Sequence, residues 1–227
     1  MNVITHNTKS ELEDKLCQEI KQKLSAAIHQ HGTARILVSG GSTPRDLFNK
    51  LSKVDIKWEN VTIGLVDDRF VDSIDEKSNE RLLKENLLVN KASKATFLCL
   101  VYDVSSKTRN LEIANNMYSH FQSRIDVTLL GMGNDGHTAS LFPKDSASKK
   151  ALGMDYHELL TYSTADVEPF DRISCSRFLL YKSTNLYLMI IGEDKLEVLK
   201  NAADNSLPIS TFFKTPTTAL KVYYSKN

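Results

Sequence analysis

The sequence predicts an α/β fold, in which a mostly parallel sheet carries helices on both of its faces. Strand-like and helix-like segments alternate along most of the chain, which is typical of parallel sheets. The strand-like segments are continuous apolar runs, as expected for strands that are buried on both faces. The 227 residues contain no internal repeat, low-complexity tract or Pro/Gly-rich linker, so we expect one domain over residues 1–227.

The first helix is predicted at residues 9–30, where Leu12, Leu16 and Ile20 share one helical face and Gly32 ends the pattern. Further helices are expected at residues 44–51, 78–88, 111–121 and 195–203. Strands are expected at residues 35–39, 61–66, 96–100, 126–130 and 186–191, with weaker candidates at 173–180 and 219–224. Residues 144–168 are the least periodic stretch, which is compatible with a lid or with an irregular excursion.

Composition and charge argue against a nucleic-acid-binding protein and against a membrane protein. Lys plus Arg number 29 and Asp plus Glu 28, and the resulting formal net charge of +1 argues against a general nucleic-acid binder. No apolar run approaches the ~20 residues of a membrane-spanning helix, and the N-terminal segment MNVITHN lacks a signal-peptide core. Cys17, Cys99 and Cys175 lie far apart, so we expect a cytoplasmic protein without disulfides. Nothing in the sequence indicates a membrane or an obligate protein partner.

Polar clusters follow three of the predicted strands, after Ser39, Val66 and Leu130. In an open parallel sheet, ligands bind beyond the carboxyl ends of the strands. We therefore expect the three clusters to converge on one site, although they are far apart in the sequence.

The first cluster, residues 39–46, reads SGGSTPRD. Its two glycines allow a ligand to approach the backbone closely. Thr43 is expected to cap a helix that Pro44 begins, with Asp46 completing a capping box. The free N–H groups of such a helix start favour phosphate, although a plain strand-to-helix turn explains the pattern equally well. The GxxxxGK[ST] spacing of a Walker loop is missing.

The second cluster is Asp67-Asp68-Arg69. Adjacent carboxylates repel one another, and Arg69 either relieves that repulsion or clamps a phosphate. A charged loop at a sheet edge is the alternative interpretation.

The third cluster, residues 131–143, reads GMGNDGHTASLFP and contains a G-x-G-x-x-G spacing. A dinucleotide site is disfavoured, because Pro143 leaves little room for the long helix that should follow. His137 is expected at the start of a short helix, where the imidazole stays neutral and suits a general base. Asp135 is placed to orient it. A hydrogen-bonded structural histidine is the alternative.

Isolated residues elsewhere give weaker signals. Arg172 and Lys195 are cations next to apolar strands, and either one alone fits a solvated charge. His29 and His31 have no third metal ligand beside them, so no metal site is expected. Ser140 lacks the G-x-S-x-G pattern of a hydrolase nucleophile.

Taken together, these segments resemble the 6-phosphogluconolactonase family, in the same order and over nearly the whole chain. The resembling segments are residues 39–44, 67–71, 78–79, 126–143, 171–174 and 192–195. The resemblance implies a modified Rossmann-like fold similar to that of glucosamine-6-phosphate deaminase. It implies hydrolysis of 6-phospho-D-glucono-1,5-lactone to 6-phospho-D-gluconate in the oxidative pentose phosphate pathway, without a cofactor. A small sugar-phosphate lactone is then the expected partner.

The resemblance also implies roles for individual residues. His137 is expected to activate the water that attacks the lactone carbonyl. From the chemistry alone, and not from the resemblance, we expect backbone N–H groups near Gly133–Gly136 to stabilise the oxyanion. Arg69 and Lys195 are expected to hold the phosphate, and Arg172 to contact the substrate or support the site. The complete set of expected substrate-binding residues is Gly40, Gly41, Ser42, Thr43, Asp67, Arg69, Gly133, Asp135, Gly136, Arg172 and Lys195.

The chain departs from the family pattern in two places. It has Asp68 where the family often has Glu, and residues 221–225 lack the usual Trp and Asp. A deaminase-like sugar-phosphate isomerase is one alternative, but that family carries a carboxylate where this chain has Phe142. A non-catalytic sugar-phosphate sensor is another, disfavoured because His137 is present.

Overall fold

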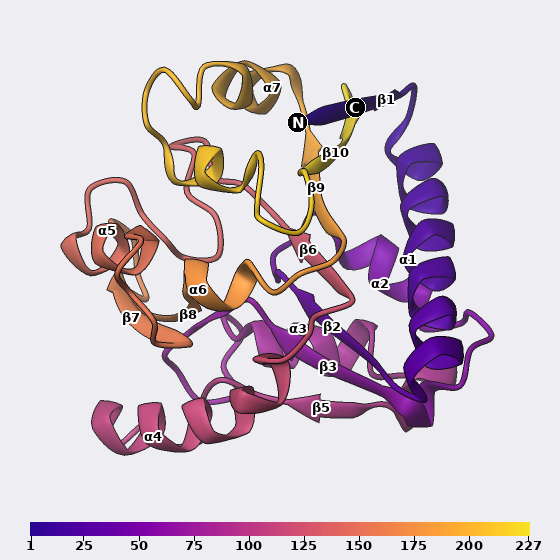
Figure 1. Ribbon diagram of the computed structural model, residues 1–227, viewed down its shortest axis with the longest axis horizontal. Coiled ribbons are helices and arrows are strands. Elements are labelled where there is room, and N and C mark those ends of the chain that lie inside the picture. The colour runs from indigo at the N-terminus through magenta and orange to yellow at the C-terminus, as the bar shows by residue number, and fades with distance from the viewer.

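Seven parallel strands form the central sheet of the computed structural model, which describes residues 1–227 (Figure 1). The strand order is β1-β10-β9-β6-β2-β3-β5, and every neighbouring pair is parallel. The strands are β1 (Asn2–His6), β2 (Ala34–Val38), β3 (Val61–Leu65), β5 (Thr96–Leu98), β6 (Val127–Leu130), β9 (Leu186–Ile191) and β10 (Lys221–Ser225). The predicted parallel α/β architecture is confirmed.

A second, antiparallel sheet of three strands lies beside the first, in the order β4-β8-β7. Its strands are β4 (Asp67–Arg69), β8 (Asp171–Cys175) and β7 (Leu160–Thr164). The predicted charged loop at Asp67–Arg69 is therefore a strand. Residues 144–168 contain helix α5 (Ser146–Leu152) and strand β7, so this segment is a regular part of the fold and not an irregular excursion. The stretch at 173–180 divides between β8 and helix α6 (Arg177–Leu180).

Helices cover both faces of the main sheet, with α1 and α2 on one side and α4, α6 and the small sheet on the other (Figure 1). The helices are α1 (Lys9–His31), α2 (Arg45–Leu51), α3 (Asn79–Asn86), α4 (Lys107–Tyr118), α5 (Ser146–Leu152), α6 (Arg177–Leu180) and α7 (Glu193–Lys200). Thr8 caps α1 by accepting the N–H of Glu11, and Gly32 ends it with a φ of 76°. No helix is long and apolar enough to cross a membrane.

One local prediction about the start of α2 was wrong, and one strand was not predicted. Thr43 does not cap α2, because Pro44 occupies the cap position and no side chain accepts a hydrogen bond there. Asp46 instead forms an ion pair with Lys9 of α1, with 2.6 Å between carboxylate and ammonium. Strand β1 was not predicted, because its residues are largely polar and exposed and it pairs only with β10 at the sheet edge.

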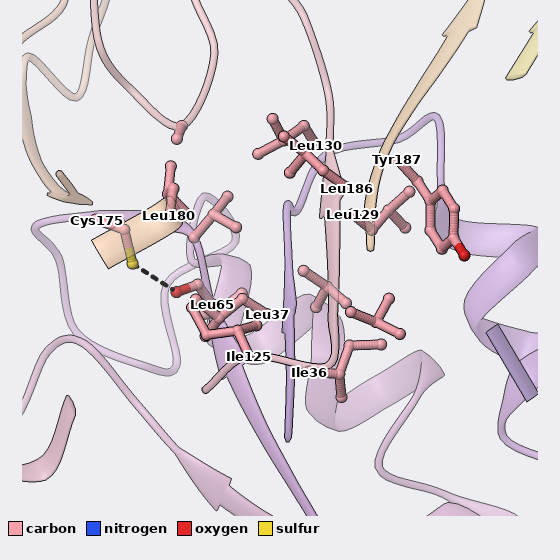
Figure 2. Close-up of a cluster of buried hydrophobic side chains, with 14 of the residues drawn as sticks. Ile36, Leu37, Leu65, Ile125, Leu129, Leu130, Cys175, Leu180, Leu186 and Tyr187 are labelled. Atoms are coloured by element: carbon pink, nitrogen blue, oxygen red, sulfur yellow. Dashed lines mark hydrogen bonds between the residues drawn. The ribbon is translucent and has the colours of Figure 1, made fainter. Parts of the chain in front are cut away.

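The apolar strand residues form the core on which the site is built. Figure 2 shows Leu37 of β2 near Leu65 of β3, and Leu129 of β6 near Leu186 of β9, all of them buried. The small sheet is fastened to this core because the Cys175 thiol donates to the Leu65 carbonyl at 3.5 Å (Figure 2). Because β6, β2 and β3 pair in parallel, their carboxyl ends lie at one edge of the sheet.

Candidate functional site

The three polar clusters meet in one cavity of about 250 Å³ at the carboxyl ends of the central strands. Its wall contains nine of the twelve residues expected at the site: Gly40, Gly41, Ser42, Thr43, Asp67, Arg69, Gly133, His137 and Lys195. The other three, Asp135, Gly136 and Arg172, lie outside this wall. The three clusters therefore converge at the strand ends, as the predicted topology alone indicated.

The loop after β2 provides backbone donors to the cavity. The N–H groups of residues 40–43 donate to no acceptor within the protein. Gly41 has a φ of 94°, a conformation that favours glycine and turns the loop toward the cavity wall. A Cβ on Gly40 would lie 2.0 Å from Oδ1 of Asn79. Four unpaired N–H groups in one turn form a concave donor set that suits a phosphate.

Two cations join this donor loop from different elements. Lys195 comes from α7, and its ammonium donates to the Met132 carbonyl at 2.8 Å. Burial lowers the pKa of Lys195 below its usual value. Arg69 comes from β4, and its guanidinium donates to the Lys77 carbonyl. Because both side chains line the cavity, an anion bound there would be attracted by both.

The pleat of β4 explains why two carboxylates can stand side by side. Successive side chains of a strand point to opposite faces, so Asp68 turns away from the cavity that Asp67 and Arg69 line. Asp68 is 1% exposed and accepts the backbone N–H groups of Asn79 and Glu80 at 2.6 and 3.0 Å. Burial raises the pKa of Asp68 to about 7, although these donors favour its ionised form. Asp68 therefore fixes the start of α3 beside the site.

His137 and Asp135 form a hydrogen-bonded pair. The His137 Nδ1 to Asp135 Oδ1 distance is 2.5 Å, and the backbone N–H of His137 donates to the same oxygen at 3.2 Å. Burial raises the pKa of Asp135, but the hydrogen bond and charge of His137 lower it by more, leaving it below its usual value. With Nδ1 engaged, Nε2 is the ring nitrogen left to accept a proton.

The surroundings of His137 differ from the prediction in one respect. No helix begins at His137, because residues 138–141 form a tight turn closed by a bridge between Thr138 and Leu141. The carboxylate of Asp135, and not a helix N-terminus, therefore sets the tautomer of the ring. The Phe142 ring packs against the imidazole with 4.6 Å between the ring centres.

The expected oxyanion donors at Gly133 and Gly136 are already engaged. The N–H of Gly133 donates to the His137 carbonyl at 2.9 Å, and the N–H of Gly136 donates to the Gly133 carbonyl at 3.0 Å. These bonds close the loop on itself and engage both glycine N–H groups, while those of Asn134 and Asp135 between them donate to no backbone acceptor. Gly133 matters for a steric reason, because a Cβ there would lie 2.3 Å from two atoms of the His137 ring. Gly136 has a φ of 76° and packs against Leu207, so it too shapes the loop.

Arg172 supports the site from behind. It is 5% exposed and lies opposite Arg69 in the β4–β8 pair. Burial and the neighbouring charge of Arg69 both lower the pKa of its guanidinium, while Asp67 and Asp68 raise it. The charges of Asp67 and Asp68 thus favour the protonated form of Arg172, which lies outside the cavity wall.

Two cavity residues were missed as contributors to the site. Asn79 donates its side-chain amide to the Asp67 carbonyl at 2.9 Å, and Ser140 donates its hydroxyl to Asp67 Oδ2 at 2.5 Å. Asn79 stands next to the cap of a predicted helix, which was the available signal. Ser140 had no signal, because its contact depends on a turn that the sequence pattern does not reveal. No group of three or more His, Cys, Asp or Glu side chains is arranged to hold a metal ion.

Comparison with known proteins places this geometry in a family. Residues 7–221 match the model described as glucosamine-6-phosphate isomerases/6-phosphogluconolactonase. The chain belongs to this family. Within it, a 6-phosphogluconolactonase of Rhizobium meliloti (strain 1021) is 34% identical over 220 residues, which cover 95% of each chain. A second, from Helicobacter pylori (strain J99), is 36% identical over 93% of this chain and 92% of its own.

Solved structures agree with this family assignment. A crystal structure of a 6-phosphogluconolactonase from Shewanella baltica OS155 has a TM-score of 0.93 at 36% identity, covering 99% of this chain and 97% of that one. A monomeric glucosamine-6-phosphate deaminase has a TM-score of 0.81 at 14% identity, covering 100% of this chain and 98% of its own. At that identity the likeness concerns the fold alone, and it confirms the predicted similarity to the deaminase fold.

Proposed function

We propose that this protein hydrolyses 6-phospho-D-glucono-1,5-lactone to 6-phospho-D-gluconate, a step of the oxidative pentose phosphate pathway. The observation that carries the proposal is a single cavity that holds a four-donor loop, two cations and a histidine paired with a carboxylate. The substrate joins a phosphate dianion to an acyl carbon, so it needs both an anion site and a base. The relatives' shared name, 6-phosphogluconolactonase, agrees with that chemistry.

Binding begins at the phosphate. The N–H groups of residues 40–43, with the hydroxyls of Ser42 and Thr43, surround its oxygens while Lys195 and Arg69 balance its charge. This fixed end converts binding energy into orientation of the lactone carbon.

Hydrolysis then needs one proton acceptor that becomes a donor. His137 Nε2 takes a proton from water as the water oxygen bonds to C1, which leaves a tetrahedral oxyanion. Asp135 stabilises the imidazolium that forms. The intermediate collapses by breaking the bond between C1 and the ring oxygen, and His137 returns its proton to that oxygen. The acid first formed at C1 keeps the second proton of the water and then loses it to solvent, so the product carries a carboxylate at C1 and the phosphate at C6.

The site offers little support for the isomerase alternative. Moving a proton between C1 and C2 of an amino sugar needs a second acid or base beside the histidine. The residue packed against His137 is Phe142, which carries no proton-transfer group. The complete pair of His137 and Asp135 also favours catalysis over a role as a sensor.

We further propose that the protein acts in the cytoplasm on this small molecule alone. Its three cysteines are free thiols, and Cys17 and Cys175 are buried, which suits a reducing compartment.

The activity is tested by following lactone loss directly. The lactone is generated in situ by oxidising glucose 6-phosphate, and its decay is recorded by NMR with and without the protein, since it also hydrolyses spontaneously. We expect clear acceleration and stoichiometric 6-phosphogluconate. A folded protein that gives no acceleration would reject the proposal, and glucosamine 6-phosphate would be the next substrate examined.

Lys195 makes phosphate binding depend on pH. Its lowered pKa means that the ammonium loses its proton at a lower pH than an exposed lysine does. Affinity for 6-phosphogluconate should therefore weaken as the pH rises from about 7 to 10, where the phosphate stays a dianion. Isothermal titration calorimetry measures this. Lys195→Arg, which remains charged, should bind with a constant affinity over the same range. A wild-type affinity that stays flat would contradict the prediction.

A further inference from the structure

Ser140 holds one oxygen of the cavity carboxylate Asp67. Its hydroxyl donates to Asp67 Oδ2 at 2.5 Å and makes no other side-chain hydrogen bond. No protein group donates to Asp67 Oδ1, while Asn79 fixes the Asp67 backbone by donating to its carbonyl at 2.9 Å. Both Ser140 and Asp67 line the cavity. The carboxylate thus has one oxygen secured by the protein and one left for a ligand.

The backbone under Ser140 is in an unusual conformation. Ala139 and Ser140 have φ values of 50° and 52°, in the left-handed region that side chains seldom adopt. Such residues persist only where their surroundings impose the conformation, and they gather at functional sites.

The surroundings here are serine hydroxyls from the small sheet. Ser174 of β8 donates to the Ala139 carbonyl, and Ser163 of β7 donates to the Ser140 carbonyl at 2.6 Å. Ser174 also lies opposite Asp67 in the β4–β8 pair. Strand β8 therefore pairs with the strand that carries Asp67 and also bonds to the turn that carries Ser140. The carboxylate and the hydroxyl are thus held in a fixed relation.

We propose that Ser140 is a positioning residue that orients Asp67 to accept a hydroxyl of the sugar ring. This inference rests on the proposed function, because it needs a polyhydroxylated substrate in the cavity. An ionised carboxylate only accepts hydrogen bonds, and the hydroxyls of a gluconolactone ring can donate to it. With Oδ2 held by Ser140, Oδ1 faces the ligand in one rotamer, and no ordering of the side chain is needed when substrate binds.

The proposal predicts a split between the two kinetic constants. A hydrogen bond from the sugar to Asp67 exists in the bound substrate as well as in the transition state. Removing such an interaction raises KM and leaves kcat nearly unchanged. A general loosening of the fold would lower kcat or the melting temperature instead.

Ser140→Gly is the sharpest variant, because glycine adopts a φ of 52° readily while the hydroxyl is lost. We expect KM to rise about tenfold with kcat within about threefold, as for loss of one charge-assisted hydrogen bond. The melting temperature should not fall. Ser206→Gly is the matched control, since Ser206 is exposed and has a φ of 51°. It should leave KM and kcat unchanged.

A double variant tests whether Ser140 acts through Asp67. In an Asp67→Ala background, Ser140→Gly should add no further increase in KM. An unchanged KM in Ser140→Gly, or effects that add in the double variant, would overturn the proposal. A crystal structure of Ser140→Gly gives a readout that is independent of activity: we expect the Asp67 carboxylate to rotate or become disordered, and an unmoved carboxylate would also overturn it. Failure of the proposed function is distinguishable, because the wild type itself would then not hydrolyse the lactone.

Discussion

Replacing His137 with Gln is expected to lower kcat for lactone hydrolysis by ~10²–10⁴-fold, the usual contribution of a positioned general base. Gln fills much of the space of the ring and can keep a hydrogen bond to Asp135, but it cannot accept a proton at neutral pH. The loss should therefore appear in the chemical step. Progress curves of lactone loss by NMR, corrected for spontaneous hydrolysis, measure it.

Binding should be spared in the same variant. The N–H groups of residues 40–43 hold the phosphate in the proposed complex, so the affinity for 6-phosphogluconate should change by less than about threefold. His31→Gln is a matched control, because His31 is an exposed histidine at the end of α1. A His137→Gln variant as fast as the wild type would show that another group accepts the proton.

The strands that carry the site were predictable because they are buried on both faces. Continuous apolar runs at β2, β3, β6 and β9 are specified locally, and their parallel order follows from the alternation with helices. The polar clusters after β2, β3 and β6 could then be placed at one edge before any contact was known. Strand topology placed the three clusters, whereas the choice of individual residues within them, and of Lys195, rested largely on the family resemblance.

The small sheet could not be predicted in this way, because its strands form only by pairing with segments that are distant in the sequence. Strand β4 has three polar residues, and it becomes a strand only by pairing with β8, about a hundred residues later. The expected capping box was wrong for a similar reason, since Asp46 pairs with Lys9 on another helix. Contacts that depend on a turn with positive φ, such as that of Ser140, follow from tertiary structure alone.

Gly133→Ala should be almost as damaging as loss of the base itself, although it removes no functional group. The added Cβ would lie 2.3 Å from Cε1 and Nδ1 of His137 and 2.7 Å from Oδ1 of Asp135. The loop cannot simply withdraw, because the Gly133 N–H is bonded to the His137 carbonyl at 2.9 Å. The imidazole must therefore move, and a displacement of about 1 Å at a reacting group costs ~10²-fold in rate. Lactone hydrolysis at saturating substrate measures the loss.

Two comparisons show whether that loss comes from displacement of His137. Gly131→Ala is the comparison in the same loop, because its Cβ would meet only the Ser39 Cβ at 3.9 Å, an ordinary contact, although Gly131 also lines the cavity. Its kcat at saturating substrate should stay near that of the wild type, because nothing displaces the imidazole. In a His137→Ala background the ring that clashes is absent, so Gly133→Ala should lower the rate no further. If Gly133→Ala slows the His137→Ala variant as much as it slows the wild type, the glycine acts on something other than the imidazole. If it is harmless in the wild type, the loop is more pliable than its hydrogen bonds indicate, and the position of the base is not what this glycine protects.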